Sequence, residues 1–263
     1  ILTMLLDNGT DLHSFQPAVK DIMKVSSCDL LIYVGGESDQ WSEDALESAQ
    51  NKDMKTINLM EVLGDTIKEE ETVEGMQDSE HEHGHEEYDE HVWTSMRNAS
   101  VICDAIAETL EEMDPENKEI YQTNAENYKA KLSTLDQKYQ ETVDTDRQNT
   151  LIFADRFAFR YLVDDYGLNY YAAFSGCSAE SEASFKTVTF LAGKLDELGI
   201  KTVLTIEKSD DRIAQTVIEN TKKKDQKILE LNSMQSITSD EIKNGVTYLS
   251  VMEDNLKVLK EAL

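Results

Sequence analysis

The sequence has 263 residues, of which 40% are hydrophobic and 30% are charged, so the chain can bury a large core as one domain or as two lobes. It carries 25 Lys and Arg against 53 Asp and Glu, a net charge of −28. This charge argues against nucleic acid and anionic membrane surfaces as partners and favours cations, although most of it is expected to be surface solvation.

The three cysteines, Cys28, Cys103 and Cys177, lie far apart and form no CxxC pair. The spacing therefore predicts neither a zinc knuckle nor a disulfide framework, and Cys28 and Cys103, which lie beside apolar residues, are expected in the core. No apolar run approaches the length of a transmembrane span. The chain opens on the apolar residues 1–6, which are typical of the middle of a fold, so a preceding segment is expected to be missing.

Apolar runs alternate with amphipathic stretches over the first 60 residues. This alternation predicts a parallel sheet with helices on its faces, and a ligand site at the carboxyl ends of the strands. His13 follows one such end. The expected elements are strands at residues 1–6, 30–34 and 56–59, and helices at residues 17–25 and 41–49.

Residues 65–90 change in character, with many acids, Gly75 and Gly84, and almost no apolar side chains. Such a stretch cannot offset the entropy of ordering, which predicts a mobile loop. It contains His81, His83 and His85 among carboxylates, and four of the five histidines fall between positions 81 and 91. We expect loose binding of a divalent metal there. The alternative is a solvated acidic loop with incidental histidines.

His91 stands directly before Val92 and Trp93, ahead of a helix whose apolar face is marked by Ile102, Ala105, Ile106, Leu110 and Met113. This place beside a helix start predicts a histidine that the scaffold positions. Taken alone, it is typical of a structural histidine; together with His13 it becomes a candidate metal ligand.

A long uninterrupted helix is predicted over residues 114–143. Asp114 and Pro115 are typical of a helix start, and Tyr121, Ala125, Tyr128, Leu132, Leu135 and Tyr139 then recur at spacings of three and four. Such a helix reaches about 45 Å and can span two lobes. The alternative is an ordinary long helix within one domain.

The second half repeats the alternation and predicts another parallel α/β sheet. Its strand ends offer Asp155, Glu207 and Asn232 as ligand candidates, and residues 176–182 form a further loop at a strand end. The expected strands are residues 150–153, 168–174, 202–206 and 227–231, and the expected helices are residues 157–166, 185–198, 212–221 and 245–263.

Five motifs in series carry a resemblance to a known family: residues 8–17 (NGTDLHSFQP), 33–41 (YVGGESDQW), the histidine-rich acidic loop, 89–95 (DEHVWTS) and 114–117 (DPEN) with its helix. In this order they resemble the zinc and manganese substrate-binding proteins of bacterial ABC transporters, of the zinc-uptake solute-binding lipoprotein type. The resemblance covers essentially the whole chain.

The resemblance implies an α/β fold of the cluster A-I type: two lobes, each a parallel sheet flanked by helices, joined by one long rigid helix. The expected domains are an N-terminal lobe at residues 1–113 that lacks its first strand and helix, the linking helix at 114–143 and a C-terminal lobe at 144–263. It also implies an extracytoplasmic, monomeric receptor on the cell surface, anchored by lipid through the missing segment, that delivers its metal to the membrane permease.

The second lobe departs from the family pattern. Where the family has a third histidine, this chain has Asp155 or Arg156, and the aspartate after the last strand is Asn232. Only His13 and His91 carry over, so the expected ligands are His13, His91, Asp155 and Glu207. Glu180, Cys177, Asn232 and water remain open, and Arg156 either orients Asp155 or neutralises it.

Two imidazoles with carboxylates suit Zn²⁺, and Mn²⁺ less specifically. A metal held by both lobes would draw them together, and its affinity should fall as the pH drops through about 6.5, the ordinary imidazole pKa. The sequence has no HExxH, P-loop or nucleophile elbow, so no enzyme is predicted. The alternative function is an adhesin or interaction protein on the same fold with weakened metal binding.

Overall fold

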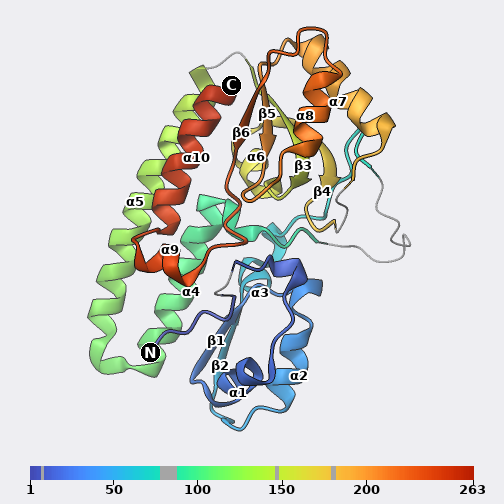
Figure 1. The fold of residues 1–263 in the computed structure, drawn as a ribbon. Coiled ribbons are helices and arrows are strands. Elements are labelled where there is room, and N and C mark those ends of the chain that lie inside the picture. The colour runs from blue at the N-terminus through green and yellow to red at the C-terminus, as the bar shows by residue number, and fades with distance from the viewer. Residues whose placement is uncertain (7–8, 78–87, 146–147, 179–181) are drawn as a thin grey trace. The chain divides into compact units, whose positions relative to one another are not determined.

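The computed structural model describes residues 1–6, 9–77, 88–145, 148–178 and 182–263. These residues form two compact units, each assembled from separate stretches of the chain. Unit 1 contains Ile1–Ile67, Ser95–Thr134 and Gln235–Val246, and unit 2 contains Lys68–Thr94, Leu135–Met234 and Thr247–Leu263. Each unit holds one parallel sheet flanked by helices, and a long helix contributes to both, which confirms the predicted fold class (Figure 1).

The sheet of unit 1 has two parallel strands, β1 (Leu30–Tyr33) and β2 (Lys55–Asn58), paired from Leu30 with Lys55 to Tyr33 with Asn58. Helices α1 (Val19–Ser27) and α2 (Trp41–Glu47) pack beside it through a small core of Val25, Leu31 and Ala45. Short α3 (Leu59–Leu63) follows β2 directly, because Asn58 caps it by accepting from the backbone N–H groups of Met60 and Glu61.

The expected strand at residues 1–6 is wrong. The described residues of this stretch are in no strand, and Ile1 and Leu2 are exposed. A strand needs a partner that satisfies its backbone N–H and C=O groups, and among the described residues β1 pairs only with β2. Apolar composition therefore did not determine secondary structure here.

Two helices dominate the rest of unit 1. Helix α4 (Met96–Met113) is capped by Ser95, whose side chain accepts from the N–H of Asn98. After the 3₁₀ turn η5 (Pro115–Asn117), α5 (Lys118–Thr145) runs without a break. The predicted long helix is thus confirmed, although its first turn is 3₁₀. Residues of α5 up to Thr134 belong to unit 1 and those from Leu135 to unit 2.

Four parallel strands in the order β4-β3-β5-β6 form the sheet of unit 2: β3 (Thr150–Phe157), β4 (Asn169–Ser175), β5 (Thr202–Thr205) and β6 (Lys227–Glu230). Helices α7 (Phe185–Leu198) and α8 (Arg212–Glu219) cover one face, over a core that includes Ile152, Leu191 and Val203. Strand β3 is longer than predicted and contains an irregularity between Phe153 and Arg156.

Helix α10 (Tyr248–Ala262) packs on β5 and β6, and Figure 1 shows it beside α5. Within unit 2, Tyr139 of α5 is fully buried and donates its hydroxyl to the Met252 carbonyl at 2.6 Å, while its ring stacks on Tyr166 of α6 (Arg160–Tyr166). Helix α9 (Ser239–Lys243), like α3, was not predicted. Over the part of the chain that the structure describes, no helix combines the length and apolar character needed to cross a membrane.

Candidate metal site

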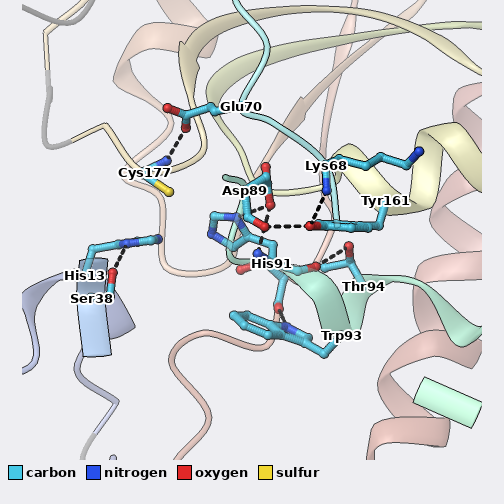
Figure 2. A network of polar contacts seen from close by, with 11 residues as sticks. His13, Ser38, Lys68, Glu70, Asp89, His91, Trp93, Thr94, Tyr161 and Cys177 are labelled. Carbon is cyan, nitrogen blue, oxygen red and sulfur yellow. Dashed lines mark hydrogen bonds and ion pairs between the residues drawn. The ribbon is translucent and has the colours of Figure 1, made fainter. Parts of the chain in front are cut away.

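His91 lies just before the 3₁₀ turn η4 (Val92–Thr94), and its side chain is 0% exposed. Asp89, also buried, accepts from the His91 backbone N–H at 2.8 Å and pairs with the ring Nδ1 at 2.9 Å (Figure 2). In the neutral imidazole, a proton on Nδ1 that is donated to this carboxylate leaves the lone pair on Nε2, the nitrogen that can bind a metal. Carboxylate–histidine pairs of this kind orient imidazole ligands of metals and raise their basicity.

A hydrogen-bonded frame holds this pair in unit 2. The hydroxyl of buried Tyr161 donates to the Asp89 carbonyl at 2.7 Å and accepts from the Lys68 N–H at 3.1 Å, and burial raises the pKa of this phenol (Figure 2). The Trp93 ring lies against the imidazole, with ring centroids 5.5 Å apart, and its Nε1–H donates to the Ser233 carbonyl at 2.7 Å. The frame fixes His91 in one orientation.

The described ends of the predicted loop at residues 65–90 are hydrogen-bonded to other parts of unit 2. The carboxylate of Glu70 accepts from the Cys177 N–H at 3.0 Å, Glu71 accepts from the Tyr170 hydroxyl, and the Gln77 N–H donates to the Ala173 carbonyl. The low apolar content predicted mobility; polar groups at these ends bond to β4 and to the turn after it, and the mobility of the loop stays a prediction. The loop histidines His81, His83 and His85 lie outside the described residues, as does Glu180.

Cys177 follows the end of β4 in a turn that the Ser178 N–H closes on the Ser175 carbonyl. Its Sγ lies within 4.8 Å of a ring nitrogen of His91. Burial raises the pKa of the Cys177 thiol, and the charges of Glu70, Asp89 and Glu90 raise it further, while a hydrogen bond from the Glu90 backbone lowers it by less. The thiol is therefore protonated at neutral pH unless a cation offsets these carboxylates.

His13 belongs to unit 1, in the 3₁₀ turn η1 (Leu12–Ser14). Asp11 caps this turn by accepting from the His13 N–H at 3.0 Å, and the ring Nδ1 is hydrogen-bonded to Ser38 Oγ at 2.7 Å (Figure 2). Like His91, this imidazole is therefore oriented through Nδ1 by a neighbouring side chain.

The other predicted ligands take different positions. Asp155 is half-buried in β3 and accepts from the Arg156 N–H at 2.8 Å. Glu207 is buried, and its oxygens accept from the N–H and hydroxyl of Ser233 at 2.7 to 3.0 Å. Among the described residues, neither carboxylate joins a group of three or more His, Cys, Asp and Glu side chains arranged to hold a metal ion.

Asn232, the remaining candidate after a strand, is held by its neighbours. Its side-chain oxygen accepts from the Met234 N–H at 2.8 Å, and its backbone exchanges two hydrogen bonds with the side chain of Asn255. The amide therefore stabilises the turn after β6.

Comparison with known proteins agrees with this architecture. The family described as zinc-uptake complex component A, periplasmic, matches residues 1–262, so the chain belongs to that family. The family is defined by zinc uptake and is not an enzyme family, as predicted from the missing catalytic motifs.

Individual relatives carry the same description. The zinc-binding lipoprotein AdcA of Streptococcus pneumoniae is 32% identical over 98% of this chain and 50% of its own length, and the high-affinity zinc uptake system protein ZnuA of Bacillus subtilis is 28% identical over 99% and 80%. The Zn(II)-bound ZnuA-like domain of the pneumococcal AdcA has a TM-score of 0.74 at 29% identity, covering 98% of this chain and 88% of that domain. The chain thus spans about half the length of several curated relatives.

Proposed function

We propose that this chain is an extracytoplasmic receptor that binds one zinc ion through His13 and His91 and delivers it to the membrane permease of an ABC transporter. The observation that carries the proposal is the buried His91 imidazole, held by the Asp89 carboxylate in the manner of a metal ligand. Zinc is favoured over manganese because the relatives are zinc-binding proteins and imidazole suits zinc.

Several parts of the proposal rest on the relatives. The family description places its members in the periplasm, and AdcA is called a lipoprotein, which supports an extracytoplasmic site of action. Anchoring by lipid through a further segment and docking to a permease are proposed on the same basis, and a monomeric state is proposed from the sequence resemblance. Loose capture of metal by His81, His83 and His85 and ligation by Asp155 or Glu207 stay predictions.

The first test is a zinc titration of metal-free full-length chain against a competing chromophoric chelator. The background protein carries His81→Ala, His83→Ala and His85→Ala, because deleting the whole loop would remove Glu70 and Gln77, which bond to unit 2. We expect one equivalent with submicromolar affinity, a Kd that corresponds to more than about 8 kcal/mol of binding free energy. His13→Ala and His91→Ala should each abolish tight binding.

Unchanged tight binding in either alanine variant would show that the ligand assignment is wrong. Negligible metal affinity together with a macromolecular ligand retained in excess chelator would instead support the adhesin alternative. Circular dichroism of each variant verifies that the fold is intact.

A further inference from the structure

Zinc in proteins usually has four ligands, at least three of them side chains. Among the described residues, the one histidine of unit 2 is His91. The Asp155 carboxylate accepts from the next backbone N–H, beside the irregularity in β3. A receptor that holds zinc therefore needs another donor close to His91.

We infer that the Cys177 sulfur is that donor and binds zinc together with the His91 imidazole. The assignment rests on the proposed function, because it names a further ligand of the same ion. The sulfur and a ring nitrogen of His91 lie within 4.8 Å of each other. Zinc bonds of about 2.3 Å to sulfur and 2.05 Å to nitrogen at a tetrahedral angle separate the two donors by about 3.6 Å, so a small side-chain rotation brings them to bonding positions.

The backbone around Cys177 is built for close approach to the histidine. A Cβ on the preceding Gly176 would lie 2.8 Å from His91 Cε1 and 2.7 Å from the Phe157 carbonyl oxygen, both closer than real Cβ contacts. Glycine is thus required for steric reasons, and it brings the turn directly against the imidazole. The Cys177 N–H then donates to Glu70 at 3.0 Å, which holds the turn in place (Figure 2).

The surrounding charge suits a cation. Glu70 accepts from the Cys177 N–H, Asp89 pairs with the His91 ring, and Glu90 directly precedes His91, so three carboxylates lie around these two side chains. A divalent ion bound between sulfur and imidazole would be attracted by all three, in a partly buried place where charges interact more strongly than in water. A sulfur ligand also sets selectivity: thiolate favours zinc and other thiophilic metals over manganese, which prefers oxygen donors.

Cobalt(II) provides the direct test, because cobalt bound to thiolate absorbs in the near ultraviolet by charge transfer whereas cobalt bound only to nitrogen and oxygen does not. The full-length chain with the three loop histidines replaced is titrated with cobalt, and then with zinc against the chromophoric chelator. We expect the charge-transfer band in this protein and its loss in Cys177→Ser. Zinc affinity should fall about 100-fold in that variant, because loss of an outer-shell partner alone costs about 10- to 100-fold and a direct ligand should cost at least as much as the upper end.

Cys28→Ser and Cys103→Ser are the matched controls, since both are partly buried free thiols of unit 1. Each should keep the band and the affinity. A second measurement needs no variant: in the protein with all thiols present, zinc should slow alkylation of Cys177 by iodoacetamide, followed by mass spectrometry, and leave Cys28 and Cys103 unchanged.

The outcomes separate the two proposals. Metal binding that depends on His91, without a charge-transfer band and without protection of Cys177, overturns the sulfur ligand and leaves the receptor proposal standing. The absence of any binding that depends on His91 overturns the receptor proposal and the sulfur ligand with it.

Discussion

His91 could be singled out from the sequence, but its surroundings could not. Its place before a helix start, beside Trp93, predicted a positioned histidine, and the structure shows a buried ring with a bonded Nδ1. Asp89 was within reach of sequence reasoning, two positions upstream. Tyr161 bonds to Asp89 from 72 positions away and Ser233 bonds to Trp93 from 140, separations over which no local period or spacing gives a signal.

Asp89→Asn tests the carboxylate that orients His91. The amide keeps the size of the side chain but removes the negative charge that raises the basicity of the imidazole. We expect zinc affinity to fall about 10- to 100-fold while the circular dichroism spectrum is unchanged. Asp53→Asn, which alters an exposed carboxylate by the same charge, is the control. Equal effects of the two substitutions would mean that only net charge matters.

Glu207→Gln tests whether the second predicted carboxylate is structural. Its two oxygens accept hydrogen bonds from Ser233, and the Ser233 carbonyl accepts the Trp93 indole N–H. The Glu207 carboxylate therefore holds Ser233 in the position that orients Trp93 against His91. Replacing one acceptor oxygen by an amide NH₂ should lower the free energy of unfolding by about 1 to 3 kcal/mol, measured by denaturant titration of metal-free protein. A loss of zinc affinity as large as that of His91→Ala would instead restore Glu207 as a ligand.

At the scale of elements, the sequence predicted whether a segment is a strand or a helix better than it predicted the residues at which the segment begins and ends. Helix α7 begins and ends at the predicted residues 185 and 198, because Ser184 caps its start and Gly199 takes the left-handed conformation at its end. The strand predicted at residues 1–6 is wrong because a strand forms only where a second strand pairs with it, and the local sequence does not reveal that partner. Short α3 and α9 each span five residues, too few for a hydrophobic period to be recognised.

The turn after β1 gives an element-scale prediction. Gly35 has φ +91°, and a Cβ there would lie 2.4 Å from Oδ1 of Asn58, the cap of α3. Gly199 also has positive φ, at +69°, but a Cβ there meets nothing within 4 Å. We expect Gly199→Ala to cost about 1 to 2 kcal/mol of unfolding free energy from backbone strain alone.

Gly35→Ala should cost about 1 to 3 kcal/mol more than Gly199→Ala, because the added methyl also displaces the helix cap. Both are measured by chemical denaturation with circular dichroism. Equal costs would indicate that Asn58 moves aside freely and that the packing around Gly35 is not what requires glycine.

At the scale of the whole molecule, the proposed ligands divide between the units: His13 lies in unit 1 and His91 in unit 2. A ligand that binds the folded state stabilises whatever must be folded to hold it. One zinc ion bound by both histidines therefore links the stabilities of two units that each have their own sheet and core. Hydrogen exchange measures the stabilisation of each unit separately, because the exchange rates of strand amides report local and global opening.

We expect zinc at about 100 times its Kd to slow exchange by up to about 100-fold, the equivalent of about 2.7 kcal/mol, in β1 and β2 of unit 1 and also in β3 and β4 of unit 2. In His13→Ala, which should abolish tight binding, the protection should disappear from both units, whereas His83→Ala should behave like the unaltered chain. Protection confined to unit 2 in the unaltered chain would show that zinc is held without His13, by His91 and its neighbours alone, and that metal binding does not couple the two units.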